Sequence, residues 1–208
     1  MISTILANTL GDSYTTASVA SVPSIDAFLN SYTAIARGSR QPWLTADAAA
    51  ALAEAAPDVD FTLWSRHDAA RALLLLSRAA HLGDEACAEA SLACFVAGDA
   101  SEQESWLRAV ALLPSPSQFT PQVIDACRTN ILPVFRAIAL GNPFPARHFP
   151  ELNFNQMVLK ALFNGVPLKG IVGLQERRNT ELARMAGDYA AERRAAGRTV
   201  PEDIGLAL

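Results

Sequence analysis

The segment at residues 153–163 constrains the fold more than any other part of the chain. Read as an α-helix, it places apolar side chains on almost every side: Phe154, Met157, Val158, Leu159, Ala161, Leu162 and Phe163. A helix that is apolar all round belongs in the interior of a protein. The segment also carries Asn155, Gln156 and Lys160, which an interior accepts only when they have hydrogen-bonding partners. The sequence therefore predicts a helical fold with polar groups clustered in its core.

Helix signals recur along the rest of the chain, whereas strand signals do not. Residues 65–68 form a variant capping box, residues 101–104 have the S-x-x-E spacing of a true capping box, and Asn179 precedes the last long helical segment. Alternating β-branched runs bounded by turn residues are missing. We expect an all-α fold of about eight helices packed as antiparallel hairpins, in a bundle or a short helical-repeat-like array.

A proline interrupts the helix that we expect at residues 121–140. Pro133 removes one hydrogen bond and frees the carbonyl of Thr129, which kinks the helix. Asn130 lies in the apolar stripe of this helix and Arg128 in a neighbouring stripe. We expect Arg128 and Asn130 to face Lys160 of the central helix across this kink.

Length and composition indicate one large domain. The chain has 208 residues, of which 50% are hydrophobic and 18% charged, so it can bury a substantial core. Residues 1–22 show no firm period, and we expect a loosely ordered N-terminal arm there, with an adapted helix as the alternative. Residues 23–208 are expected to form a single helical domain.

The charge distribution excludes some classes of partner. A formal net charge of −4 argues against a protein that binds nucleic acid or a membrane surface. Residues 169–198, however, contain seven basic and four acidic residues. Such a run is typical of a solvated helix face, and the alternative is a site for an anion or an acidic partner. No window approaches 18 uninterrupted apolar residues, so no membrane-spanning helix is expected.

The cysteines and histidines favour neither disulfides nor metal. Three cysteines without a CxxC pair, and no secretory signal, are typical of a protein in the cytoplasm. The three histidines form no H-x-x-x-H or H-E-x-x-H pattern, so we expect no metal site. No P-loop, G-x-G-x-x-G or G-x-S-x-G motif occurs, and no cofactor is expected.

Two residues are candidates for catalysis. Lys160, desolvated in an apolar helix, has the properties of a base or a Schiff-base amine. The alternative is that its stem lies along the core while the ammonium reaches water or a carboxylate. His148, in a loop close to Glu151, is a candidate proton donor or a structural residue.

A larger set of polar residues can bind a small polar ligand. Amides at the start of the central helix can hold an anion, and arginine and asparagine side chains bind hydroxyls or phosphate directionally. The alternative for each residue is a buried network that fixes helix packing. The predicted binding residues are Arg128, Asn130, Asn142, Asn155, Gln156, Lys160, Arg177 and Asn179.

Several segments resemble the EboA family. Residues 128–130, 135–139 and 142–145 resemble its "RTN…F.AIA..NP[YF]P" run, and residues 154–163 match its "WNQMVLKALF" segment. The resemblance covers residues 121–198 and is fainter upstream. Phe154 stands where tryptophan is usual, which removes an indole N–H donor and puts any ligand contact at that position in doubt.

The resemblance implies a setting rather than a mechanism. EboA-like proteins are encoded in bacterial and algal gene clusters linked to metabolite traffic, beside proteins that look like a UbiA-type prenyltransferase and a TatD-like hydrolase. We hypothesise an accessory protein that binds a small polar or lipid-linked metabolite around residues 153–164. The alternatives are an enzyme of secondary metabolism that uses Lys160 or His148, and an adaptor that docks other proteins of the cluster.

Overall fold

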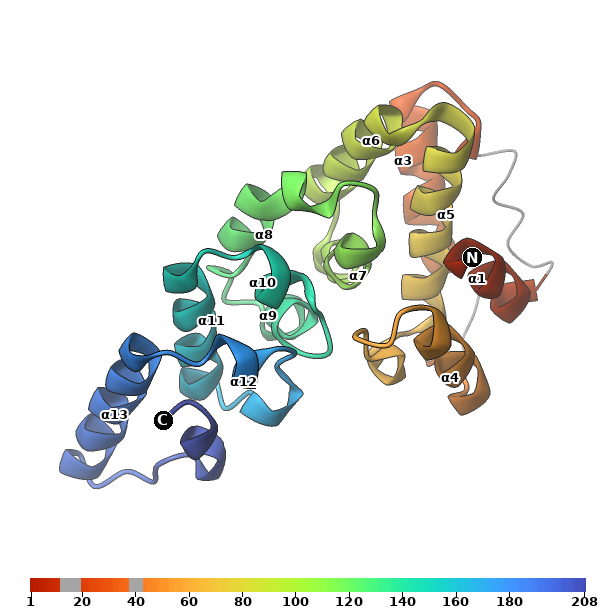
Figure 1. Ribbon diagram of the computed structural model, residues 1–208. Helices are drawn as coiled ribbons and strands as arrows, with labels where there is room; N and C mark the ends of the chain where they lie inside the picture. Colours follow the sequence, from red (N-terminus) through yellow and green to blue (C-terminus); the bar gives the residue numbers. More distant parts are fainter. Residues whose placement is uncertain (12–19, 38–42) are drawn as a thin grey trace.

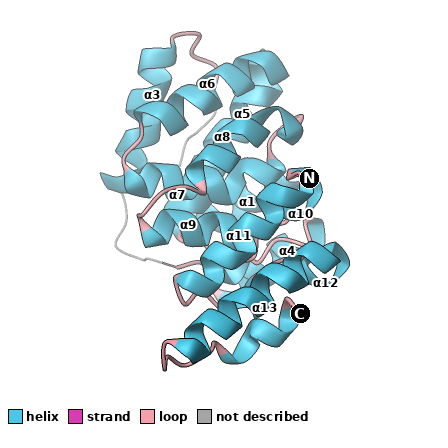
Figure 2. Cartoon of the chain, turned by 90° about the vertical axis from the view of Figure 1, so that its left-hand side faces the viewer, coloured by secondary structure: helices cyan, strands magenta, loops and turns pink. Residues whose placement is uncertain are grey.

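The computed structural model describes residues 1–11, 20–37 and 43–208, and within them the protein is all-α. The helices follow one another across the molecule, so that the two chain ends lie on opposite sides in Figure 1. Figure 2 shows that helices make up the whole described chain apart from loops and turns. This confirms the predicted fold class, although the described residues form 12 helices instead of about eight.

The α-helices have these bounds: α1 (Ile2–Leu10), α3 (Ile25–Ala34), α4 (Ala46–Ala55), α5 (Arg66–Leu82), α6 (Asp84–Ala97), α7 (Ala100–Ala109), α8 (Thr120–Ala126), α9 (Leu132–Ala139), α10 (Phe144–His148), α11 (Glu151–Phe163), α12 (Leu174–Arg177) and α13 (Thr180–Ala195). Short 3₁₀ turns connect several of them: η2 (Ile35–Arg37), η3 (Phe61–Leu63), η4 (Val110–Leu112), η5 (Pro116–Phe119), η6 (Leu168–Gly170) and η7 (Glu202–Leu206). The added helices arise from the N-terminal segment, from the division of residues 121–140, and from the short α10 and α12.

The first residues differ from the loose arm expected at residues 1–22. Residues Ile2–Leu10 form α1, whose Leu6 and Leu10 are buried against α5. The i, i+4 spacing of these two leucines gives the short helix one apolar side, and burying that side holds it on the protein. The part of the expectation at residues 12–19 lies outside the described residues.

Helix caps were predicted well at α5 and wrongly at α7. Ser65 and Asp68 form the expected capping box of α5. At α7 the box consists of Asp99 and Glu102, not of residues 101 and 104. Both pairs have the required spacing, and tertiary contacts favour the first pair. The buried Glu102 carboxylate lies 3.9 Å from Arg71 Nη2, and its backbone carbonyl accepts a hydrogen bond from Tyr32.

The expected kinked helix at residues 121–140 is two separate helices. α8 ends at Ala126, and α9 begins at Leu132 with Pro133 in its first turn. A proline inside a continuous helix loses a hydrogen bond and clashes with the preceding turn, whereas the first turn tolerates it. Thr129 Oγ1 accepts a hydrogen bond from the backbone N–H of Ile131 within the break. The break therefore relieves the strain that a kink would retain.

Two hydrophobic cores run through the molecule. The smaller one joins α1, α4, η3 and the first half of α5, and contains Trp64 and Phe61. The larger one extends from α3 and the second half of α5 through to the C-terminus, with Trp106 and Phe154 among its fully buried members. The buried Trp106 indole donates to Ser91 Oγ at 2.6 Å. The helix α5 belongs to both cores and so ties the two ends together.

A buried polar network joins α3, α5 and α7. The Arg71 side chain is 1% exposed and donates to the carbonyls of Tyr32 and Ser101 and to Ser105 Oγ. Ser105 in turn donates to Asp68 at 2.6 Å. Removing one member of a buried charged network leaves its partners without hydrogen bonds, and this costs more than the net value of the network.

We expect Arg71→Ala to lower the free energy of unfolding by about 3–5 kcal/mol, because Glu102, Ser105 and the carbonyls lose a shared partner. The matched control is Arg184→Ala, which removes an exposed arginine paired with Glu181 and Asp188. Exposed pairs contribute little, so the control should unfold as the unchanged protein does. Urea denaturation measures both; equal effects would contradict a structural role of the network.

Candidate functional site

Helix α11 lies where the sequence placed it, but it is not buried on every side. Phe154, Met157 and Val158 are buried, as expected of the central helix. In contrast, Leu152 is 59% and Phe163 is 63% exposed. Helix α11 packs against α9 and η6 on one side and α13 on another. These contacts leave a strip of the helix facing outward.

Lys160 joins α11 to the break between α8 and α9. Its ammonium donates to the carbonyls of Cys127 and Thr129, at 2.6 Å each, and lies 5.3 Å from the ring centroid of Phe135. The last carbonyls of a helix lack intrahelical partners, so a cation there satisfies them and interacts well with the helix dipole. The carbonyl of Thr129 is the one that the proline was expected to free.

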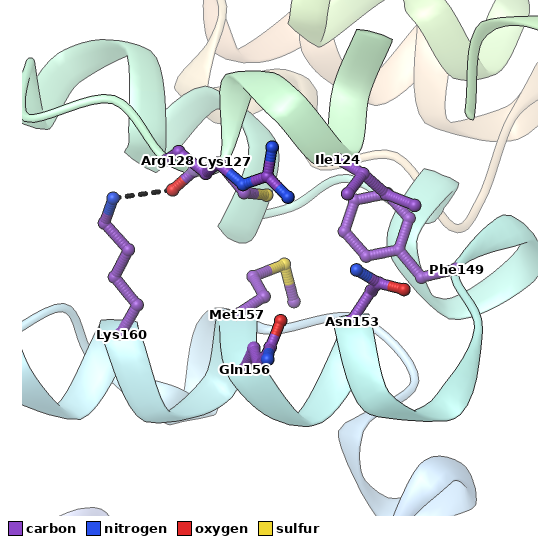
Figure 3. A pocket seen from close by; sticks show the side chains of 8 residues that line it. All are labelled: Ile124, Cys127, Arg128, Phe149, Asn153, Gln156, Met157 and Lys160. Atoms are coloured by element: carbon purple, nitrogen blue, oxygen red, sulfur yellow. Dashed lines mark hydrogen bonds between the residues drawn. The ribbon is translucent and has the colours of Figure 1, made fainter. Parts of the chain in front are cut away.

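A cavity of about 320 Å³ lies between α8 and α11. Figure 3 shows its two walls. The α11 wall presents Asn153, Gln156, Met157 and Lys160, and the opposite wall presents Ile124, Cys127 and Arg128, with Phe149 at one end. The four α11 residues recur at intervals of three, one and three, which places them on one helix face. The volume is at the lower end of the range for small-molecule sites.

The chemistry of this cavity is cationic on one side and apolar on the other. Lys160 and Arg128 bring positive charge, and no acidic residue is among the described lining residues. Outside the lining, Asp125 forms an ion pair with Arg128 at 2.9 Å. Met157, Ile124 and Phe149 supply apolar surface, while Asn153 and Gln156 offer amides. Such a lining suits a small anion with polar groups and an apolar edge.

Of the residues predicted to bind a ligand, Arg128, Gln156 and Lys160 line this cavity. Asn130 is exposed and does not line it. The Arg128 side chain is 77% exposed, so it faces the cavity from the solvent side rather than from the core. Arg128 and Asn130 were both expected to face Lys160; Arg128 shares the cavity lining with Lys160, whereas Asn130 does not. The helix break turns the backbone carbonyls, not these side chains, toward the lysine.

The other four predicted binding residues hold the backbone in place. The buried Asn142 donates to the carbonyls of Leu107 and Ala137 and accepts from the N–H of Phe144. Asn155 and Asn179 exchange two side-chain hydrogen bonds of 3.1 and 3.0 Å, which couple α11 to the start of α13. These contacts use the amide groups in packing.

Arg177 fixes the turn before α11. Its guanidinium donates to the carbonyls of Ala146 and Phe149, and its carbon lies 4.7 Å from the ring centroid of Phe154. Phe154 is fully buried and does not line the cavity. The phenylalanine at position 154, where the resemblance led us to expect tryptophan, therefore affects packing against Arg177. It does not change the lining of this cavity.

The Cys127 thiol in the cavity lining is not activated as a nucleophile. Burial raises the pKa of the Cys127 thiol to about 12, and the positive charge of Lys160 offsets this only in part. The thiol is therefore protonated at neutral pH and is a weak nucleophile. His148 stacks on Phe144, with ring centroids 4.7 Å apart, and does not line the cavity.

Five lining residues were not predicted from the sequence: Asn153, Met157, Ile124, Cys127 and Phe149. The signal for two of them was available, because Asn153 and Met157 share a helix face with Lys160. Ile124 and Phe149 come from segments whose orientation depends on the helix break. In the part of the chain that the structure describes, no group of three His, Cys, Asp or Glu residues could hold a metal ion, and no helix has the length and apolarity to cross a bilayer.

Comparison with known proteins gives one match. The model of a family described as "Metabolite traffic protein EboA" matches residues 13–207 of the chain. Neither a curated protein nor a solved structure matches it.

We expect Lys160→Met to lower the free energy of unfolding by about 1–3 kcal/mol, because two carbonyls lose a charged donor. Amide exchange at residues 127–131 should accelerate more than exchange in α13. The control is Lys169→Met, which alters an exposed lysine in η6. Urea denaturation and hydrogen exchange measure the two effects; unchanged protection of the break would show that Lys160 does not hold it.

We expect His148 to titrate below 6.5 in the folded protein. Burial lowers its pKa, and the positive charge of Arg147 lowers it further. The folded state then binds fewer protons than the unfolded state, so stability is full above the unfolded pKa and declines as the pH falls through the folded pKa. NMR titration checks the value. Arg147→Gln should raise the pKa only part of the way, since burial is the larger cause; a full return to 6.5 would contradict this order.

Proposed function

This chain belongs to the EboA family, and on that premise we propose that it is an accessory protein of metabolite traffic that binds a small polar or lipid-linked metabolite between α8 and α11. The observation that carries the proposal is the cavity itself. It combines two cationic side chains, two amides and an apolar surface, without a lining carboxylate in the described chain.

The proposed binding groups are the side chains that packing leaves available. Lys160 uses two of its N–H donors on backbone carbonyls, and an ammonium has three. Gln156 is exposed on the cavity wall, and Arg128 has a planar guanidinium suited to oxyanions. Asn142, Asn155, Arg177 and Asn179 are proposed to support the site by holding the surrounding backbone.

Binding is favoured over catalysis by the environment of Lys160. A nucleophilic amine must be free to attack the carbon of its substrate, whereas the Lys160 Nζ is held by hydrogen bonds to two backbone carbonyls. His148 lies outside the cavity lining. The arrangement therefore supports a holder of a metabolite better than an enzyme that uses either residue.

An adaptor function is the second candidate, and the basic segment at residues 169–198 favours it. Part of that charge is already used within the protein. Arg177 holds two carbonyls, Arg184 pairs with Glu181 and Asp188, and Arg193 donates to the carbonyl of Thr199. Arg178 also donates to Gln175 and to the carbonyl of Leu208. The exposed Arg194 and Arg198 are the arginines proposed to contact co-encoded partners, such as a UbiA-type prenyltransferase or a TatD-like hydrolase.

The test is native mass spectrometry of the protein after incubation with a small-molecule extract of its source cells. We expect a retained molecule, and we expect Gln156→Trp to lose it, because the indole fills the cavity from an exposed position. Gln175→Trp places the same ring at another exposed position and should retain the molecule. If both variants retain the molecule, or if both lose it, the cavity is excluded as the site.

A further inference from the structure

The outward strip of α11 continues the cavity wall as an apolar surface. Leu152, Gln156, Leu159 and Phe163 are spaced four, three and four residues apart and so lie on one helix face, here termed the α11 ridge. Leu152 and Phe163 are 59% and 63% exposed, and Leu159 is half-buried. The ridge spans eleven helical steps, from residue 152 to residue 163, roughly 16 Å at 1.5 Å per residue. The two ends of the ridge stay more than half exposed, although Phe163 contacts Tyr189 of α13.

Single exposed hydrophobic residues are ordinary on protein surfaces. The ridge differs because its members share one face and adjoin a cationic cavity. Gln156 belongs to both the ridge and the cavity wall, and Lys160 lies next to Leu159 in the chain. The ring of Phe163 packs edge-on against Tyr189 of α13, with centroids 4.6 Å apart. This contact holds the exposed phenylalanine in a fixed position beside the cavity.

We propose that the ligand of this site is an amphiphilic anion, whose phosphate or carboxylate group lies between Lys160 and Arg128 and whose hydrocarbon chain lies along the α11 ridge. This inference rests on the proposed function and names its ligand class. The two cations match an oxyanion, and the uncovered leucines and phenylalanine match a chain that needs contact on one side only.

Three features determine this choice of ligand. A purely polar ligand would leave the ridge exposed, and a neutral lipid would leave the Lys160 ammonium in a cavity whose described lining holds no carboxylate, since Asp125 pairs with Arg128 outside that lining. The cavity alone, at about 320 Å³, is too small to enclose both a head group and a long chain. The chain must therefore leave the cavity, and the ridge is the apolar surface that adjoins it.

The experiment measures the binding of butyl, octyl and dodecyl phosphate, of the matching carboxylates and of inorganic phosphate, by isothermal titration calorimetry below the micelle concentration. Full burial of a methylene gives about fourfold in affinity, and contact on one side about twofold. We expect octyl phosphate to bind about sixteenfold more tightly than butyl phosphate, since it has four more methylenes, and alkyl amines not to bind. Whichever anion series binds more tightly identifies the head group.

Variants separate the head from the chain. Arg128→Gln should weaken every member of the series by a similar factor. Leu152→Ser and Phe163→Ser change exposed residues and should flatten the dependence on chain length, with inorganic phosphate, which has no chain, as the reference ligand of the head-group site. Val96→Ser, which alters a residue 73% exposed on α6, is the control and should change nothing.

The possible outcomes are distinct. Binding without dependence on chain length overturns the inference and leaves the proposed function standing. If no anion binds but native mass spectrometry shows a retained molecule, the inference is overturned and the proposed function stands. If no molecule is retained either, both the inference and the proposed function are overturned.

In two further outcomes Phe163 is needed for another event while the soluble series binds without it. Sedimentation with phosphatidylserine vesicles that requires Phe163 would assign the ridge to a membrane, and dimerisation that requires Phe163 would assign it to a second copy. Either result overturns the inference.

Discussion

The contact of the Lys160 ammonium with the carbonyls of Cys127 and Thr129 determines the geometry of the C-terminal half. Pro133 forces a helix break, and the break exposes carbonyls that have no partner in their own helix. A lysine one helix away supplies the donors. The separation of α8 from α11 follows from the reach of that side chain, and the cavity lies in the space that results.

Polar residues in this region divide into two groups by burial. Among the buried ones, Asn142 donates to backbone carbonyls and Asn155 donates to the Asn179 side chain. An apolar interior requires such partners for buried polar groups. The half-buried and exposed ones, Lys160, Gln156 and Arg128, keep donors directed toward the cavity or solvent. Much of the motif that resembles the EboA family therefore specifies the fold, while a smaller part faces the proposed ligand.

Phe163 shows how a helical pattern can mislead. Its place in an apolar run predicted a core position, and the structure leaves it 63% exposed beside Tyr189. Periodicity identifies the faces of a helix, but it does not show which face a neighbouring helix covers. The same limit applies to Arg128 and Asn130, whose placement depended on whether Pro133 kinks the helix or divides it.

The sequence by itself determined the helical class, the α5 capping box and the cap at Asn179, because these depend on local spacing. It also determined that Lys160 needs partners, because burying a polar group without them costs free energy. Only the tertiary structure decided which partners those were, where α7 begins, that residues 121–140 form two helices, and which face of α11 stays open. Each of these choices depends on contacts between segments far apart in the chain, and local spacing is equally compatible with the alternatives.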